Sequence, residues 1–443
     1  MSLLLIVFIS ISSILIGKIL FKKWFNHLAL YSLIMGGLIF FYELKLLPYP
    51  QLKPLVWFLV ISAFLAYLLG IITIFSAKNL SNNKLVNKKI DLSNSNLFNN
   101  NGRLLKYSVL FFCLIGLFVA LHRWYILIGY FGSIQNVILN AAVVYRLNAK
   151  GEIKEFIPFL PSFIYVGVFL SGIYTAYRGK FSFLSFFPII TIILKELTYF
   201  GRGEMLFSSM EFIITFFLFR HFLSNDPDKK FKFSRNNAFV AIIILLGILI
   251  TASSFIRVSR GIKENFVGTS RQLNQFKDNF LFTPSVYLYL SSDIGVFNKY
   301  MVLEDEETGF GENTFHFFYE LLSRFDIVKK PNPFQKGYFI PMWVNTGTYL
   351  REIHADFGIA GIFLIPYLLG LTITFLWFKF YKSPNLIILM FLVYLFIIIG
   401  FSFLVMVTRL NQWYFAQLFT IIYLFLFEKI SGKKNIVLLE NET

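Results

Sequence analysis

Residues 54–76 read PLVWFLVISAFLAYLLGIITIFS, a run without a single charged side chain. A helix of this length is roughly 35 Å long at ~1.5 Å per residue, which is enough to cross the ~30 Å hydrocarbon core of a bilayer. The run is one of many in a chain of 443 residues that is 57% hydrophobic and 15% charged. Soluble domains carry about 25% charged residues. The sequence therefore predicts a protein that crosses the membrane several times.

Hydropathy read outward from this run predicts an all-α polytopic membrane protein with eleven spanning helices. They lie near residues 2–20, 28–47, 54–76, 107–128, 156–177, 182–200, 205–222, 237–256, 354–378, 385–408 and 411–428. The first lacks the basic start and small-residue cleavage site of a signal peptide, so we expect it to be retained. The expected divisions are 1–256 with eight helices and a basic linker at 78–106, a large loop at 257–353, and 354–443 with three helices and a short tail.

The sidedness of the helices follows from the basic residues of the short connections. Alternate connections, counted from the first loop, hold 20 Lys and Arg on one side and 7 on the other. Because cytoplasmic loops carry the excess, the N-terminus is expected outside, and the C-terminus and the linker inside. This bias accounts for about half of the 41 basic residues behind the net charge of +17, so we expect a lipid bilayer and no nucleic acid as partner.

Several classes of site are excluded by what the sequence lacks. The single cysteine, Cys113, lies in an apolar run, which excludes a disulfide scaffold. There is no Walker loop, no H-E-x-x-H and no cysteine cluster, which excludes ATP-driven transport and zinc proteolysis. The acidic run at 304–307 lacks the alternating spacing of a calcium loop and is expected to be a solvated turn. We therefore expect neither a metal nor a cofactor.

The loop 257–353 is too long to be a simple connector, since loops above ~12 to 15 residues are usually functional or disordered. Its many aromatic residues argue against disorder. Residues 314–325 place Phe318, Leu321, Leu322 and Phe325 at helical spacing, and a second helix is predicted at 283–301. We expect these helices to lie in the membrane interface on the outer face and to roof a cavity between the spans.

The strongest local signal is Gly201-Arg202-Gly203-Glu204, a two-glycine turn between two spans on the expected outer side. Glycine lets the backbone approach a ligand closely, and the guanidinium of Arg202 matches phosphate oxygens. The alternative is a tight hairpin in which Arg202 extends to the lipid headgroups and pairs with Glu204.

Arg257 and Arg260 follow the eighth span at a spacing that puts both on one helix face. Two guanidiniums on one face at the outer membrane level are suited to hold a diphosphate. An ordinary interfacial anchor for a helix end is the alternative.

A third candidate region, 343–361, leads from the loop into the ninth span and is rich in polar groups. Arg351, His354 and Asp356 are candidates for binding phosphate or sugar hydroxyls, and a structural pair of His354 with a carboxylate is the alternative. Gly358 and Gly361 are expected to permit close helix packing. Arg123, Arg146 and Arg409 are candidates for lining the same cavity, and anchoring is the alternative for each.

Together these features resemble the oligosaccharide repeat unit polymerases, the O-antigen polymerase (Wzy-like) group of bacterial envelopes. Three pieces carry the resemblance: Gly201 to Glu204 between paired spans, the large outer loop late in the chain, and Asn345 to Tyr349 running into Asp356-Phe357-Gly358 and Gly361. The related O-antigen ligases have a histidine where Gly347 stands here, so His354 cannot inherit its role.

The resemblance implies metal-independent glycosyl transfer at the periplasmic face of the bacterial inner membrane. Its substrates are repeat units linked to undecaprenyl diphosphate, destined for O-antigen or capsule. Expected partners are a chain-length regulator and a flippase. Arg202, Arg257 and Arg260 are the candidates for stabilising the leaving diphosphate, and Glu204, Asp356 or His354 for accepting the proton. Candidate substrate-binding residues are Arg123, Arg146, Asn345, Tyr349, Arg351 and Arg409.

Two other classes of function remain open. A lipid-linked oligosaccharide flippase or other polysaccharide transporter would also need a basic cavity, with charges that continue along the helices. The charges counted within the spans are few, namely Lys18, Lys195 and the pair His122-Arg123. A structural protein whose loop docks a partner is the third reading.

The topology can be tested by cysteine accessibility. After Cys113 is replaced, single cysteines at Ser291 and Ser93 should react differently with an impermeant thiol reagent added outside, because the first lies in the outer loop and the second in the cytoplasmic linker. Equal labelling of both positions from outside would contradict the predicted sidedness.

Overall fold

The computed structural model describes residues 3–79, 89–91, 97–153, 159–224, 235–261, 264, 266–279, 283–303, 306, 308–332, 334–431 and 437–439. Most of the first half of the basic linker, the start of the fifth expected span and three residues of the acidic run at 304–307 lie outside this part.

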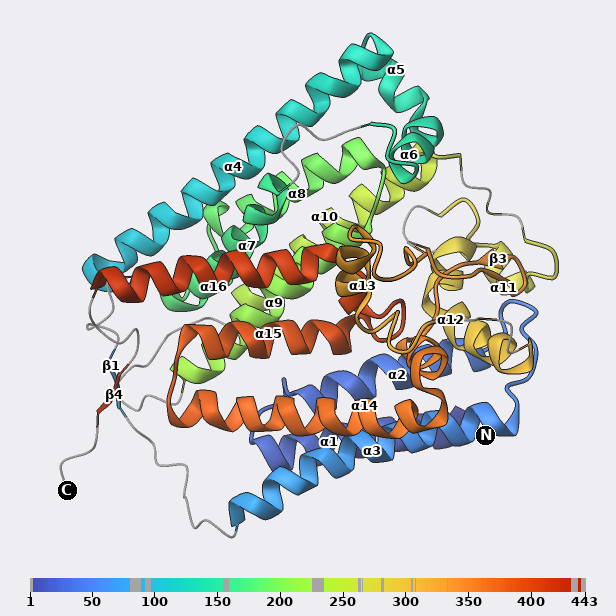
Figure 1. Ribbon diagram of the computed structural model, residues 1–443, viewed down its shortest axis with the longest axis horizontal. Coiled ribbons are helices and arrows are strands. Elements are labelled where there is room, and N and C mark those ends of the chain that lie inside the picture. Colours follow the sequence, from blue (N-terminus) through green and yellow to red (C-terminus); the bar gives the residue numbers. More distant parts are fainter. Residues whose placement is uncertain are drawn as a thin grey trace. The chain divides into compact units, whose positions relative to one another are not determined.

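A helix occupies each stretch in which a membrane span is predicted (Figure 1). The eleven helices are α1 (Leu3–Phe21), α2 (His27–Glu43), α3 (Pro54–Asn79), α4 (Asn99–Phe131), α7 (Phe163–Arg178), α8 (Phe183–Tyr199), α9 (Gly203–Leu223), α10 (Arg235–Ser259), α14 (Tyr349–Lys382), α15 (Leu386–Phe401) and α16 (Asn411–Ser431). Within the described residues, six helical stretches are long and apolar enough to cross a membrane: Leu3–Phe21, Pro54–Ala77, Asn99–Phe131, Leu160–Arg178, Gly203–Leu223 and Tyr349–Lys382. The chain is therefore a helical membrane protein.

Further elements connect these helices, and all but the 20-residue α12 are short. They are α5 (Ile134–Leu139), α6 (Ala141–Ala149), α11 (Arg271–Asn274), α12 (Pro284–Leu303), α13 (His316–Ser323) and the 3-10 helices η1 (Leu160–Ser162) and η2 (Val407–Arg409). Two small antiparallel sheets pair β1 (Lys89–Asp91) with β4 (Val437–Leu439) and β2 (Tyr338–Phe339) with β3 (Trp343–Val344). The linker 78–106 holds β1 and the start of α4.

The chain forms two compact units that are each discontinuous in sequence. Unit 1 comprises Met1–Lys84, Lys263–Phe378 and Leu395–Tyr414, and unit 2 comprises Leu85–Ile262, Lys379–Tyr394 and Phe415–Thr443. In unit 1, α1 packs on α2, and α12 packs on both α2 and α3. In unit 2, α7 packs on α4 and α9, and α8 packs on α4. The boundaries of these units differ from the expected divisions after residues 256 and 353. The expected divisions were based on membrane sidedness, and they stay a prediction.

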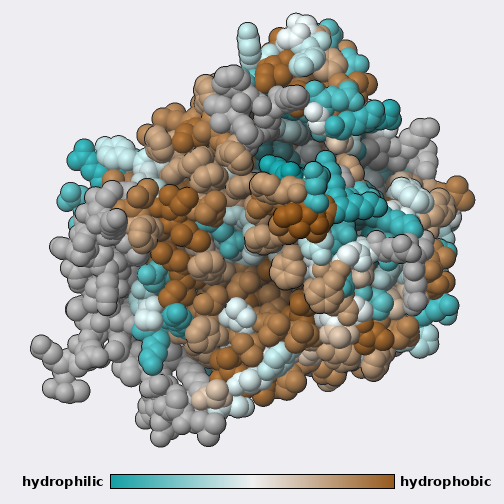
Figure 2. Space-filling view, viewed as in Figure 1, coloured by the Kyte–Doolittle hydropathy of each residue, from teal (hydrophilic) through white to brown (hydrophobic). Residues whose placement is uncertain are grey.

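Large hydrophobic side chains are exposed on the outer sides of the helices (Figure 2). On α4 they include Phe111, Leu114, Phe118 and Leu121, and on α14 they include Phe363, Leu364, Leu368 and Phe375. Exposed apolar rows of this extent are characteristic of a surface in contact with lipid tails.

Both helices predicted in the large loop are present, as α12 and α13. Most of α12 is buried, including Tyr287, Asp293 and Phe297, because α2 and the β2–β3 sheet cover it. A helix lying in the membrane interface leaves one side in water. The segment 283–303 is therefore an integral part of unit 1 rather than a cover laid over it.

Gly358 has a different role from the close packing expected of it. It interrupts α14 at φ 62° and ψ −153°, a conformation essentially restricted to glycine, and a Cβ there would meet no atom within 4 Å. A Cβ at Gly361 would lie 2.7 Å from Ile353 of the same helix. The expectation was wrong for Gly358, which makes a kink that separates Asp356 from the apolar part of α14.

Close helix packing occurs instead between α3 and α14, at Gly70 and Gly370. A Cβ on Gly70 would lie 2.2 Å from the carbonyl oxygen of Tyr367, and a Cβ on Gly370 would lie 2.3 Å from that of Tyr67. Each glycine therefore admits the backbone of the other helix, an arrangement common where membrane helices cross.

The structure also shows which positions suit the cysteine labelling test of topology. Ser291 is fully buried and hydrogen bonded to Tyr49, and Ser93 lies outside the described residues. Val267, which is 94% exposed, and the exposed Ser383 between α14 and α15 are better positions for the outer and inner label.

The reciprocal glycine contact predicts a large packing defect. Gly370→Val should force α3 and α14 apart, since backbone atoms cannot move aside as a side chain can, and overpacking of this kind typically costs about 1 to 3 kcal/mol. Gly37→Val on α2 is the matched control, because a Cβ there meets nothing within 4 Å. The measurement is thermal unfolding of the detergent-purified variants. Equal melting temperatures for the two would contradict the packing assigned to Gly370.

Candidate functional site

The Gly201 to Glu204 segment forms the turn between α8 and α9 in unit 2. Phe200 adopts the left-handed conformation that ends α8, and Arg202 is the N-terminal cap residue of α9. A Cβ on Gly201 would lie 2.9 Å from the Glu196 carboxylate, so this glycine makes room for a side chain of the protein itself. Gly203 is exposed, and a Cβ there would meet nothing. Only Gly203 therefore has the open surroundings expected of a backbone that a ligand approaches.

Glu204 is tied to the end of α8 by an ion pair with Lys195. The Lys195 Nζ to Glu204 Oε2 distance is 2.6 Å, and the side chains are only 5% and 18% exposed. The Tyr165 hydroxyl of α7 donates to the same carboxylate oxygen at 2.7 Å. Removing one partner of a buried pair costs about 3 to 5 kcal/mol, so the geometry of this turn is firmly fixed.

Arg123 lies buried at the same end of unit 2. Its guanidinium donates to the Asn148 side chain and sits 4.5 Å from the centre of the Tyr199 ring. The Lys195 ammonium lies 5.2 Å from the centre of the same ring, and Asn148 donates to the Thr198 carbonyl. The Tyr199 ring is thus in contact with two buried cations, Arg123 of α4 and Lys195 of α8.

The short helix α6 connects these residues with the end of α10. The Arg260 guanidinium lies 3.7 Å from the centre of the Tyr145 ring, and Tyr145 precedes the exposed Arg146. α10 packs against both α6 and α8, and Arg257 is buried near its end. We call Arg123, Arg146, Lys195, Arg202, Arg257 and Arg260 the basic cluster. Five of its six members are sequence candidates, and Lys195 is the addition.

The unit 1 candidates surround the start of α14, where charged groups are buried in pairs. Arg351 binds both carboxylate oxygens of Glu306, with Nε 3.0 Å from Oε2, and its guanidinium lies 5.4 Å from the centre of the Tyr338 ring. Glu306 belongs to the acidic run predicted to be a solvated turn. For this residue the prediction was wrong, because a bidentate pair with a buried arginine removes it from water.

Asp356 holds the turn that precedes α13. Its Oδ1 accepts from the backbone and side-chain amides of Asn313, each at 2.9 Å. Its Oδ2 accepts from the backbone N–H of Thr314 at 2.6 Å and from the Thr314 hydroxyl at 2.7 Å. A carboxylate with four donors is a structural anchor, and a role as proton acceptor would require it to give up some of these bonds.

Arg409 joins three separate segments of unit 1. It pairs with Glu352 at 3.3 Å, donates to the Asn313 side chain, and donates to the Asn332 carbonyl at 2.8 Å. Glu352 in turn accepts from the backbone N–H of Met406 at 2.5 Å.

The remaining unit 1 candidates are Tyr349, His354 and Asn345. The hydroxyl of Tyr349 lies 2.7 Å from that of Tyr31. His354 Nδ1 lies 2.9 Å from the Tyr300 hydroxyl. Asn345 is exposed.

The twelve candidates therefore fall into two sets, each contained in one unit. Arg123, Arg146, Arg202, Glu204, Arg257 and Arg260 belong to unit 2, and Asn345, Tyr349, Arg351, His354, Asp356 and Arg409 belong to unit 1. The unit 2 set is dominated by cations, whereas in the unit 1 set Arg351 and Arg409 pair with Glu306 and Glu352, which the sequence did not single out.

Asp293 on α12 is a buried carboxylate that sequence reasoning missed. It is fully buried, and neither carboxylate oxygen has a hydrogen-bond partner among the described residues. Burial raises the pKa of the Asp293 carboxyl well above its ordinary value, while the Thr346 hydroxyl and Arg351 act to lower it. A single aspartate in an aromatic helix of the loop gave no signal that it would be buried.

Glu196 and Glu211 are two further buried carboxylates that the count of charges within the spans left out. Both lie inside predicted spans, at 182–200 and 205–222, so their positions in the sequence were a sufficient signal. Charges within the spans are therefore more numerous than predicted, and they include acids.

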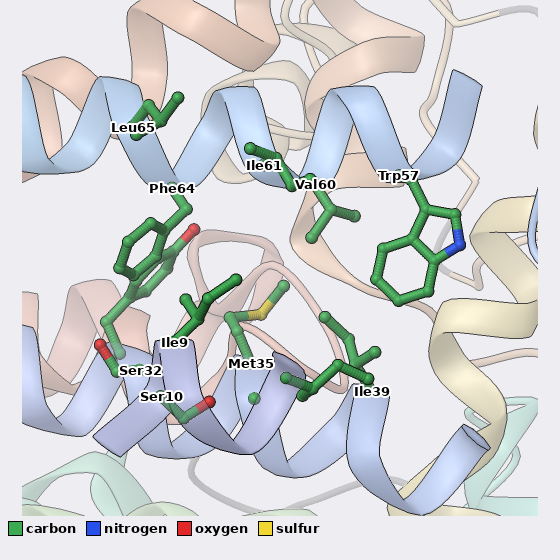
Figure 3. Close-up of a pocket in the computed structure, with 13 residues that line it drawn as sticks. Ile9, Ser10, Ser32, Met35, Ile39, Trp57, Val60, Ile61, Phe64 and Leu65 are labelled. Carbon is green, nitrogen blue, oxygen red and sulfur yellow. The ribbon is translucent and has the colours of Figure 1, made fainter. Parts of the chain in front are cut away.

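An apolar pocket of about 260 Å³ lies between α1, α2 and α3 in unit 1 (Figure 3). Met35 and Ile39 of α2 face Val60 and Phe64 of α3 across it, and the residues with polar side-chain atoms in its lining are Ser10, Tyr31, Ser32 and Trp57. With no charged group in its wall, this pocket is unsuited to a phosphate.

The described residues contain no group of three or more His, Cys, Asp or Glu side chains placed to hold a metal ion. No family model, no curated protein and no solved structure matches this chain.

The four hydrogen bonds to Asp356 lead to a stability prediction. Asp356→Asn should destabilise the protein by on the order of 3 kcal/mol, because an amide offers one acceptor where two oxygens now serve four donors. The measurement is thermal unfolding, together with protease sensitivity of residues 308–332.

Asp326→Asn is the control, since Asp326 is exposed in the same loop and asparagine tolerates its positive φ. Full stability of Asp356→Asn combined with loss of activity would show that the carboxylate is needed for chemistry instead of anchoring.

Proposed function

We propose that this protein polymerises undecaprenyl-diphosphate-linked oligosaccharide repeat units into a surface polysaccharide, by glycosyl transfer at the periplasmic face of the bacterial inner membrane. The N-terminus would then lie outside and the C-terminus inside, with residues 257–353 in the periplasm. A flippase would supply the lipid-linked units, and a chain-length regulator would act on the product. The proposal is based on the resemblance of Gly201 to Glu204 and of residues 345–361 to the O-antigen polymerase group.

The observation that best supports the proposal is the basic cluster of unit 2. Arg123 and Lys195 are buried and share the Tyr199 ring, and Arg202 caps the helix that begins beside them. Burying cations is costly, and buried charges at membrane depth usually serve a ligand or a pathway. The N-terminus of α9 adds backbone N–H groups and the positive end of a helix dipole, which also favour an anion.

These groups suit a reaction in which a diphosphate leaves. A hydroxyl of the incoming unit attacks the anomeric carbon of the growing chain, the bond from that carbon to the diphosphate oxygen breaks, and the electron pair goes to the diphosphate. Negative charge grows on the diphosphate as the bond breaks, so cations already held in place stabilise the transition state more than the bound substrate.

The hydroxyl must lose its proton, and Glu204 is the acceptor that we propose. Lys195 and Tyr165 both donate to Glu204 Oε2. The adjacent ammonium favours the ionised carboxylate, which is the form able to accept a proton. Asp356 and His354 remain weaker candidates, because the observed hydrogen bonds of Asp356 already occupy both of its oxygens.

A lipid-linked oligosaccharide flippase or other polysaccharide transporter is the second candidate function. Glu196 and Glu211 within α8 and α9 favour it, because transporters commonly carry acidic residues along their helices.

Arg202 provides the decisive substitution. Arg202→Ala should abolish long polymer while single repeat units still reach the envelope, because only the transfer step loses electrostatic support. The loss should be about 10² to 10³ in rate, which corresponds to roughly 3 to 4 kcal/mol. Arg202→Lys should recover part of the activity, since an ammonium keeps the charge and loses the two-pronged geometry. Polymer length on a gel, in a null background with matched membrane levels, is the measurement.

Arg178→Ala is the matched control. Arg178 is also half-exposed in unit 2, but it lies in the last turn of α7, away from the α8–α9 turn. Normal long chains from well-expressed Arg202→Ala would end the proposal for this residue. Failure of single repeat units to reach the envelope would favour the transporter instead.

A further inference from the structure

Glu211 lies near the middle of α9 and is completely buried in unit 2. Its Oε1 accepts a hydrogen bond of 2.6 Å from the hydroxyl of Tyr394 on α15. Its other oxygen, Oε2, has no hydrogen-bond partner among the described residues, and neither has the hydroxyl of Thr215 one helical turn further along. A carboxyl group is thus held at membrane depth by one hydrogen bond from a neutral phenol.

Within the described part of the chain, no cation forms an ion pair with Glu211. Lys195 pairs with Glu204, which precedes Glu211 by two helical turns, or about 10 Å along the axis. The titratable side chains described on the helices in contact with α9 are Tyr165, Tyr174, Tyr177 and Arg178 on α7, Lys195, Glu196 and Tyr199 on α8, Arg257 on α10 and Tyr394 on α15.

An ionised carboxylate in these surroundings would be strongly disfavoured. Removing an unpaired charge from water is costly even after the protein relaxes, and one hydrogen bond returns only part of that cost. Two other carboxylates belong to the same helix pair, since Glu196 is buried on α8 and Glu204 lies in the first turn of α9.

We infer that Glu211 is a proton-binding site within the membrane part of unit 2, with Tyr394 as the partner that holds the neutral carboxylic acid. Oε1 is the carbonyl oxygen that accepts from Tyr394, and the proton resides on Oε2, which no side chain of the described residues approaches to hydrogen-bond distance. A metal cation is the poorer ligand for this site, because hard cations such as Ca²⁺ take six or more oxygens and only two unpartnered side-chain oxygens are present here.

The inference goes beyond the proposed function, because glycosyl transfer at the α8–α9 turn does not need a proton bound two turns further along α9. The site also connects separate helices, since Tyr394 belongs to α15 and Thr420 of α16 lies beside its hydroxyl. Loss of the proton would leave a buried charge, so release requires water to enter or the helices to separate.

Infrared difference spectroscopy on the full-length protein in lipid tests the inference. A protonated carboxyl has a C=O stretching band that a carboxylate lacks, and the band shifts in D₂O. At neutral pH, the wild type should show a band of this kind that is absent from Glu211→Gln, whereas any band of the buried Asp293 should be present in both proteins. Glu204→Gln is the control on the same helix and should leave the band unchanged, because Glu204 is ionised beside Lys195.

Tyr394→Phe gives a second readout that keeps the aromatic ring. It removes the hydrogen bond to Oε1, so the Glu211 band should shift to higher frequency without disappearing. If neither Glu211→Gln nor Tyr394→Phe alters the carboxylic acid region at neutral pH, the carboxyl is ionised and the inference is wrong. Should Glu211→Gln fail to fold, the presence or absence of the Tyr394→Phe shift decides the question alone.

Discussion

A charge can be buried in this protein only if another group of the protein compensates it. Arg351 meets Glu306, Arg409 meets Glu352, and Lys195 meets Glu204. Asp356 has no cation at hydrogen-bond distance and is instead held by four donors. Because a lipid bilayer cannot solvate charge, each pair fixes the segments that carry it, and the irregular parts of both units are organised around these pairs.

The same constraint explains why the two sets of candidate residues differ in character. In unit 1 the charged groups mostly satisfy one another, which produces a rigid framework for the segment between α12 and α14. In unit 2 cations gather around Tyr199 and Tyr145, and aromatic faces provide part of their compensation. Lys195 has a carboxylate partner as well, in Glu204.

The helices were predictable from the sequence because apolar runs such as 54–76 leave the backbone no alternative at membrane depth. The α8–α9 turn and its arginine were also predictable, since glycines beside a charge between two spans are conspicuous. The partners of the buried charged groups were not predictable from the sequence. Glu306 lies 45 residues before Arg351 in the chain, and Asn313 lies 43 residues before Asp356.

Those pairings depend on how α12, α13 and α14 fold back on one another, which hydropathy does not record. The kink at Gly358 was missed for a related reason: two glycines three residues apart, Gly358 and Gly361, suit either a helix crossing or a break in the helix. Asp293 was missed because burial of a loop residue is decided by tertiary packing alone.

The backbone contacts around residue 404 also restrict the order in which the protein can be assembled. The N–H groups of Gly347 and Tyr349 donate to the carbonyls of Leu404 and Ser402, and Arg409 reaches back to Asn313 and Asn332. A ribosome completes residues 308–350 well before it synthesises residues 402–409. The segment must therefore wait, incompletely folded, until α15 has entered the bilayer, and chaperones and proteases have access to it during that interval.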